Sequence, residues 1–244
     1  MNINIQVPYT TKPSMTRRIG PAFNTNPDIK IIGSKKKEIF DLGPKLYGET
    51  ITSYELGLVR LASRHCKKKE TDNIVELAYN FEEDIAIMHD GRLAAVCFCF
   101  PSGWFPCDKI GLTLSEIHAP VGDGEHLVKM SQKLASTMAD PVLGGFERTV
   151  WTITNNSKLT NIPGSGPFTE PKSIDELYFR QEIQSTEPLG DCKTSLFFVK
   201  INVIPLIEIW EQHGDKILDS INSMTEAVLK YKNLKVIKKL LNAI

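Results

Sequence analysis

The chain has 244 residues, of which 41% are apolar and 24% are charged, proportions that are ordinary for a globular protein and argue against disorder. Its 29 lysines and arginines balance its 29 aspartates and glutamates, so no global field attracts nucleic acid or an anionic membrane. No apolar run is long enough to predict a membrane span, and the polar N-terminus lacks the apolar core of a secretory signal. We therefore expect a cytoplasmic protein without a nucleic-acid or membrane partner, and with five reduced cysteines.

The first third of the chain predicts an irregular arm followed by helices. Residues 1–34 are rich in proline, glycine, asparagine and threonine, which is typical of irregular structure. Beyond this arm, apolar residues at spacings of three and four predict one helix over residues 53–66 and a second over residues 72–80.

The clearest local signal in the sequence is a β-hairpin. Two apolar runs, residues 85–88 and 93–100, lie on either side of His89-Asp90-Gly91-Arg92. An Asp-Gly pair between apolar runs favours a type I′ turn, because both central residues of that turn need positive φ. The second run is apolar at successive positions, so we expect its strand to be covered on both faces of the sheet.

Residues 102–140 have the pattern of helices instead of strands. We expect one or two helical turns over residues 109–118, ended by Pro120. Residues 125–138 predict an amphipathic helix with four apolar side chains on one face: Leu127, Met130, Leu134 and Met138.

The last part of the chain predicts three strands and then helices. The strands are expected over residues 148–154, 177–184 and 195–204. Two strands, a helical insert and three strands make the order of a PAS domain. We therefore predict an α+β fold with a PAS-like antiparallel sheet and flanking N- and C-terminal helices. The expected PAS-like domain covers residues 35–205, and helices in residues 206–244 pack on it.

A series of short motifs carries a resemblance to a known family. They are Phe100-Pro101-Ser102-Gly103-Trp104, Lys109-Ile110-Gly111, Ile117-His118-Ala119-Pro120-Val121, Val150-Trp151, Arg180-Gln181 and the strand ending in Pro205-Leu206. With these motifs in this order, residues 15–206 resemble the alpha subunit of the haem-dependent oxidative N-demethylases. The resemblance implies a PAS-like fold that binds haem b.

The same resemblance implies an oxidoreductase that uses O₂ on a small N-methylated amine. The sequence shows no flavin, NADPH or iron–sulfur signature, so the electrons would come from a separate reductase that carries FMN and an iron–sulfur centre and uses NADPH. The alternatives are a non-catalytic haem-binding PAS-like gas or redox sensor, and a divergent family member with another ligand or none. In each case the C-terminal helices offer a surface for homo-oligomers.

The resemblance makes His118 the axial ligand of the haem iron, in the helical insert that supplies this ligand in haem PAS proteins. Lys109 and Arg180 are expected near the haem propionates, because lysine and arginine pair with carboxylates. Trp104 and Trp151 are expected to line the pocket. The structural alternatives are a helix-end histidine, surface cations and core aromatics.

Cys107 is a second candidate ligand, because the nearby Lys109 would favour its thiolate. The sequence also departs from the family pattern at polar positions of the later strands, where it carries Thr152, Thr154, Asn155, Leu177, Phe179, Lys200 and Asn202. Because of these departures, the sequence leaves the choice between an enzyme and a sensor open.

Overall fold

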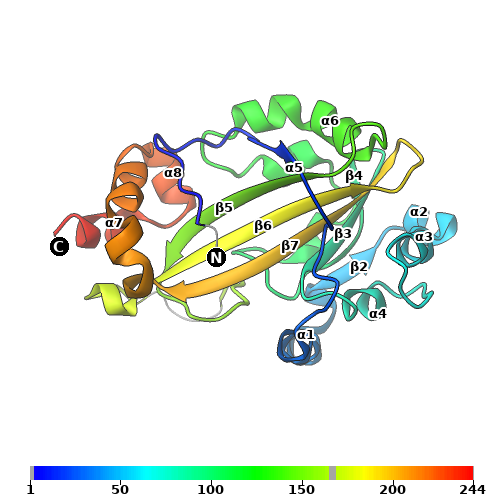
Figure 1. Cartoon of the computed structure of the whole chain (residues 1–244), viewed down its shortest axis with the longest axis horizontal. Coiled ribbons are helices and arrows are strands. Elements are labelled where there is room, and N and C mark those ends of the chain that lie inside the picture. The colour runs from blue at the N-terminus through cyan, green and yellow to red at the C-terminus, as the bar shows by residue number, and fades with distance from the viewer. Residues whose placement is uncertain (1–2, 165–168, 244) are drawn as a thin grey trace.

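An open antiparallel sheet of seven strands forms the centre of the computed structural model, which describes residues 3–164 and 169–243 (Figure 1). In spatial order the strands are β1 (Thr16–Arg17), β5 (Phe146–Thr154), β6 (Tyr178–Pro188), β7 (Thr194–Pro205), β3 (Asp84–His89), β4 (Arg92–Cys97) and β2 (Tyr47–Glu49). The two longest strands, β6 and β7, pair from Tyr178–Pro205 to Pro188–Ser195. All three strands expected after the insert are confirmed, as is the mixed α/β class.

The predicted hairpin is confirmed in β3 and β4. Its turn residues Asp90 and Gly91 have φ values of 47° and 73°, the positive pair that a type I′ turn requires. Side chains alternate across a strand, so Ile85 and Ile87 enter one core while Ala86 and Met88 enter another. The sheet is therefore covered on both faces here, as the apolar pattern predicted.

The helical insert covers one face of the sheet, which we call the insert face. It contains the 3₁₀ turn η2 (Pro106–Lys109), α5 (Leu114–His118) and α6 (Glu125–Ala139), and Figure 1 shows α6 lying along the long strands. Leu127 and Met138 of α6 are buried as expected. The prediction for Met130 was wrong, because its side chain is 42% exposed. Ser131 and Ala135 are buried instead, so the contact stripe of α6 is rotated from the expected one.

Four helices lie on the side of the opposite face, and three of them, the first, third and fourth, pack on the core over β3, β4 and β7. They are α1 (Ile29–Leu42), α2 (Ile51–Leu56), α3 (Leu58–His65) and α4 (Ile74–Ala78); the 3₁₀ turn η1 (Gly43–Lys45) follows α1. The helix expected over residues 53–66 is two helices, because Gly57 takes a left-handed conformation with φ of 62°. The helix expected over residues 72–80 is confirmed as the shorter α4.

The N-terminal arm is less irregular than expected. The range 1–34 contains β1 and the beginning of α1, whose first turn is capped by the Asp28 side chain accepting from the Lys30 amide at 2.8 Å. Before β1, Ile3, Ile5 and Tyr9 pack beside the C-terminal helices, and after β1 the chain crosses the front of the long strands in Figure 1 on its way to α1. The boundaries of the domain division stay a prediction.

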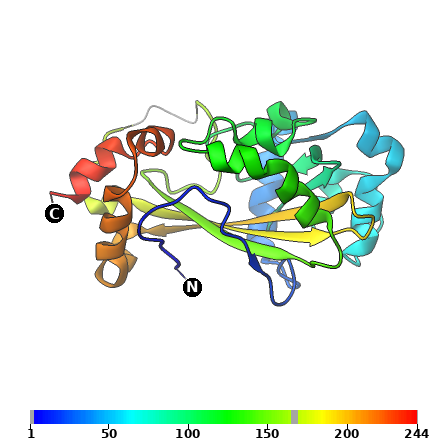
Figure 2. The same cartoon turned by 90° about the horizontal axis from the view of Figure 1, so that it is seen from above.

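The C-terminal helices cover the far end of the sheet in both views (Figures 1 and 2). They are α7 (Leu206–Asn222), α8 (Glu226–Tyr231) and α9 (Lys235–Leu241), and the turn η3 (Ile174–Glu176) lies before β6. Their apolar stripes, predicted from residue spacing, bury Ile217, Ile221 and Val228 against Phe179 and Trp151. In the described part of the chain, none of the helices is long and apolar enough to cross a membrane.

The segment that joins α5 to α6 packs directly on α8. A Cβ added at Gly122 would lie 2.6 Å from the carbonyl oxygen of Ala227, closer than atoms can approach. The Thr225 hydroxyl donates to the Asp123 carboxylate at 2.5 Å beside this contact. The C-terminal helices therefore help to hold the insert in place.

Candidate functional site

Polar side chains gather on the insert face of β5 and β6. Arg148 pairs with Gln184 and Thr152 with Arg180 across the two strands. Paired residues of antiparallel strands point to the same face, and alternation adds Glu182 to this set. These residues lie on the side of the sheet that the insert covers.

His118 ends α5, the short helix that carries the family motif. A capping box, in which Thr113 and Glu116 bond each other's backbone amides, fixes the start of this helix. His118 Nδ1 lies 2.7 Å from the Leu114 carbonyl oxygen. A carbonyl only accepts, so Nδ1 carries the proton and Nε2 keeps its lone pair.

The electrostatics keep His118 neutral. Burial is the main cause that lowers its pKa, and the positive charges of Arg148 and Lys109 lower it further, against the bond to Leu114. Burial also lowers the pKa of Arg148 itself. The charges of two cations thus act on His118; Lys109 was predicted near the haem site and Arg148 was not.

Arg148 is held by the sheet and by the N-terminal arm. Its Nε donates to the Gln184 side chain at 2.7 Å, and Nη1 donates to the Pro13 carbonyl at 3.4 Å. The register of β5 was the signal that could have identified it. Arg148 and Thr152 are four residues apart on a strand, so they share a face.

Arg180 is 2% exposed, and its donors are engaged by the Ser102 hydroxyl and by backbone carbonyls. Its Nε donates to the Ser102 hydroxyl at 2.9 Å, Nη2 to the Phe100 carbonyl at 2.9 Å, and Nη1 to the Lys158 carbonyl at 3.3 Å. This guanidinium ties the segment after β4 to β6. The structure thus gives Arg180 a clear structural role.

A chain of hydrogen bonds connects the two arginines along β6. The Ser102 hydroxyl, which accepts from Arg180, donates to the Glu182 carboxylate at 2.6 Å. The other Glu182 oxygen accepts from the Gln184 amide at 2.8 Å, and Gln184 in turn accepts from Arg148. Sequence reasoning missed Glu182, because its face depends on strand register.

The two predicted tryptophans lie in different cores. Trp104 packs edge to face on Phe98, with ring centroids 5.6 Å apart, in the cluster that contains Leu114 and Ile117 of the insert. Trp151 stacks on Phe179 at 5.5 Å under the C-terminal helices. Trp151 is paired with Gln181, whose side chain points away from the insert face. The structure brings Trp104, but not Trp151, to the helix of His118.

Cys107 does not have the environment expected of a thiolate ligand. Its sulfur bonds to the Asp108 carboxylate at 3.5 Å, and burial together with this carboxylate raises the pKa of the thiol. The expected influence of Lys109 is not the dominant one. Within residues 3–164 and 169–243, no cluster of three or more His, Cys, Asp or Glu side chains is arranged to hold a metal ion.

The fold and the site define a mixed α/β protein in which a helical insert carries a buried histidine whose pKa is lowered by burial and by the charges of two cations. Residues 42–242 match the family described as haem-dependent oxidative N-demethylase, alpha subunit-like. The chain belongs to this family, which relates it to haem-dependent oxidoreductases of the N-demethylase type. None of the curated proteins matches the sequence.

Proposed function

We propose that this chain binds haem b on the insert face with His118 as axial ligand, and that it acts as a haem-dependent oxidoreductase. The observation that carries the proposal is the state of His118. Its Nδ1–H is bonded to the Leu114 carbonyl, which orients the ring and leaves the Nε2 lone pair for iron. Family membership makes haem the cofactor to test first.

The residues around His118 fit a haem group in their chemistry. Haem carries two propionates, and Arg148 and Lys109 are cations whose charge acts on His118. Trp104 and Ile117 supply apolar surface of the kind that packs on a flat macrocycle. We assign the propionates to Arg148 and Lys109, and we place Arg180 in support of the segment around Ser102.

The arrangement of the strands supports a PAS-like fold for residues 35–205. Five strands follow the order β5-β6-β7-β3-β4, and the insert joins β4 to β5. The hairpin before the insert thus lies beside the last strand, as the PAS-like reading requires. In this proposal the C-terminal helices, residues 206–244, are an addition that packs on the domain.

Haem, when bound, would supply the activation of O₂ for oxidation of a small N-methylated amine, which yields formaldehyde and the demethylated amine. The chain's own residues would hold the cofactor through His118, orient it through the propionates, and exclude water with the apolar insert. The electrons would come from a separate reductase that uses FMN, an iron–sulfur centre and NADPH. We place the reaction in the cytoplasm.

A second candidate is a haem-based gas or redox sensor without turnover. Leu177 and Phe179 stand where the family pattern has an arginine and a glutamate, and both are fully buried among apolar residues. Thr152 also replaces an arginine, and its hydroxyl is buried without a hydrogen-bond partner in the described part of the chain. Polar groups that would act on O₂ or an amine are thus replaced.

Haem titration of the purified protein, followed by absorption, tests the proposal. We expect a sharp Soret band that saturates at one haem per chain and is lost or shifted in His118→Ala. His126→Ala is the matched control, because His126 is exposed on α6. No specific band in the wild type would exclude both haem functions. Formaldehyde release from N-methylated amines with a reductase then separates the enzyme from the sensor.

A further inference from the structure

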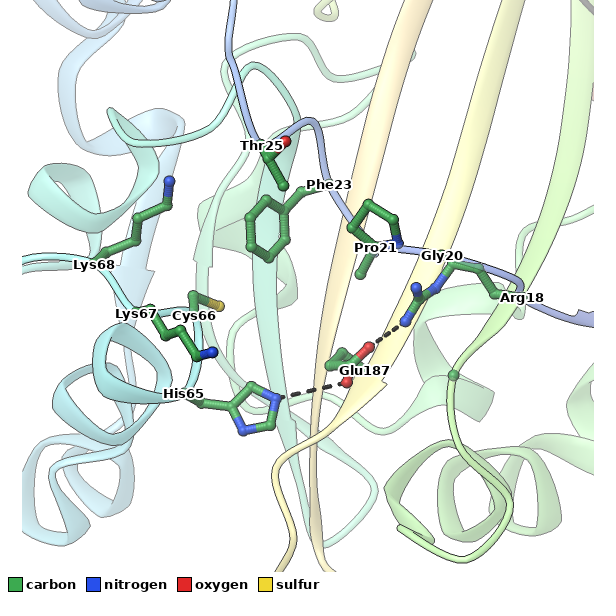
Figure 3. Close-up of a pocket in the computed structure, with 12 residues that line it drawn as sticks. Arg18, Gly20, Pro21, Phe23, Thr25, His65, Cys66, Lys67, Lys68 and Glu187 are labelled. Carbon is green, nitrogen blue, oxygen red and sulfur yellow. Dashed lines mark hydrogen bonds and ion pairs between the residues drawn. The ribbon is translucent and has the colours of Figure 1, made fainter.

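A hollow of about 580 Å³ lies on the face of the sheet opposite the insert (Figure 3). Its walls come from the segment after β1, the end of α3 and the end of β6. None of the residues predicted for the haem site lines it. The apolar wall residues Ala22, Phe23 and Cys66 belong to the core cluster on that face, so this hollow is separate from the site of His118.

Basic groups outnumber acidic ones in this hollow. Among the described residues that line it, Arg18, His65, Lys67 and Lys68 carry basic side chains, and Glu187 carries the only carboxylate. Glu187 is shared between two of them, since it forms an ion pair with Arg18 and lies 3.7 Å from His65 Nε2. Figure 3 shows both contacts converging on this carboxylate. One carboxylate therefore leaves an excess of positive charge.

Arg18 is built into the wall of the hollow. Its side chain is only 6% exposed, and Nη2 donates to the Thr186 carbonyl at 3.3 Å as well as to Glu187. Its Nε is buried and has no partner among the described residues. A Cβ added at Gly145 would lie 2.4 Å from Nη2, so the backbone leaves room for this guanidinium at close contact. The ion pair with Glu187 offsets the cost of burying this charge and fixes the guanidinium in the wall.

The two lysines follow α3, and no carboxylate forms an ion pair with either of them in the described residues. Lys67 is exposed, with φ of 54°. The Lys68 ammonium lies 5.5 Å from the centre of the Phe23 ring and 5.4 Å from that of Phe81, a cation–π arrangement that places it at the rim. Both positive charges are therefore available to an anion.

Most of the remaining lining side chains are apolar, with Thr25 as a polar exception. Pro21, Ala22 and Phe23 line one side of the hollow. A second hollow of about 260 Å³ shares His65 with the first and is lined by Leu61, Leu189, Gly190 and Asp191. The carboxylate of Asp191 makes this second hollow less suited to an anion, so the negative group belongs to the first. A ligand that satisfied these walls would carry a negative group and a short apolar part.

We propose that this hollow binds a small organic anion, a carboxylate or a phosphate ester with a short apolar body. Its negative group lies among His65, Lys67 and Lys68, and its apolar body packs on Phe23. This site is independent of haem and of the proposed function.

Calorimetric titration at low ionic strength tests the site, with butyrate and inorganic phosphate as separate probes. We expect saturable binding of at least one probe, and the stronger one identifies the class of the negative group. The double variant Lys67→Gln/Lys68→Gln should weaken binding roughly tenfold or more, because two charge-assisted contacts are lost. Lys67→Gln alone, at an exposed position, should show a smaller loss and needs no change in the core.

Lys69→Gln is the matched control, since Lys69 continues the same basic run but does not line the hollow. Glu187→Gln should act in the opposite direction and strengthen binding, because it removes the competing carboxylate. Three results would each overturn the proposal: no saturable binding of either probe, an equal loss in Lys69→Gln, or weaker binding in Glu187→Gln. Circular dichroism checks that each variant is folded.

Discussion

Replacing Lys35 by methionine should destabilise the protein strongly, although this residue belongs to a run of three lysines. Its side chain is fully buried, and Nζ donates to the carbonyls of Phe81 at 3.1 Å, Ala78 at 3.4 Å and Glu83. The Asp84 carboxylate, also buried, lies 3.6 Å away. This ammonium joins α1 to the start of β3.

The size of the effect follows from what Lys35→Met leaves behind. Methionine fills much of the same space, so packing is largely kept. Three buried carbonyls lose a donor, and the Asp84 carboxylate loses its counter-charge. Removing one partner of a buried ion pair costs about 3–5 kcal/mol. Since domains are typically stable by about 5–15 kcal/mol, the variant would be marginally folded.

Urea unfolding followed by circular dichroism measures this change. Lys36→Met is the matched control, because Lys36 is exposed and its ammonium lies over the Tyr79 ring at 5.4 Å; we expect little change. Adding Asp84→Asn to Lys35→Met should restore part of the loss, since no uncompensated charge remains. A loss below about 1 kcal/mol, or one equal to that of Lys36→Met, would refute the reasoning.

Three further changes test other parts of the structure. Gly122→Ala should lower the free energy of unfolding by about 1–3 kcal/mol, because its Cβ meets the Ala227 carbonyl. Gly33→Ala, in open space on α1, should instead raise the free energy of unfolding by about 0.5–1 kcal/mol, and equal thermal shifts of the two variants would contradict this reasoning. Burial lowers the pKa of Lys232 to about 8 in the folded protein, below its unfolded value of about 10.5. Between these two pH values the unfolded chain binds more protons than the folded one, so the stability of the wild type should rise with pH relative to that of Lys232→Gln. Parallel curves for the two proteins would show that Lys232 is not the cause. The lowered pKa of His118 keeps its imidazole neutral, so haem affinity should stay constant as pH falls from 8 to about 6.5 and decline only below about pH 6.5. A decline that is complete by about pH 6.5 would count against His118 as the ligand of the haem iron.

Local patterns predicted most of the fold. The hairpin was found because Asp90-Gly91 encodes its turn within four residues. Helix α1 was missed for a physical reason: Ile29 and Phe40 are exposed, and the one fully buried residue of α1, among those described, is Lys35. From the sequence alone a lysine is expected to be exposed to solvent, because its carbonyl partners are brought to it only by the tertiary structure. The short strands β1 and β2 exist through their pairing and carry little signal of their own.

Contiguous motifs indicated one part of the candidate site, and strand register decides the other part. His118 and Trp104 stand in contiguous motifs, and Trp104 packs in one cluster with Leu114 and Ile117 of the helix that His118 ends. Whether Arg148, Glu182 and Trp151 belong to the candidate site depends on which face of their strands the insert covers. A shift of one residue moves every side chain of a strand to the other face. Alternation in the sequence therefore shows which residues share a face, but it does not show which face the helices cover.

The strand order also has a consequence for the order of synthesis. β3 lies between β4 and β7, and Asp84 pairs with Val199. The hairpin of β3 and β4 can form early, but its partner on the other edge leaves the ribosome more than 100 residues later, roughly ten seconds at common rates of translation. During that interval the nascent chain presents an apolar strand edge without its partner, a surface that other chains can pair with. Production of this protein should therefore be sensitive to chaperone supply and to temperature.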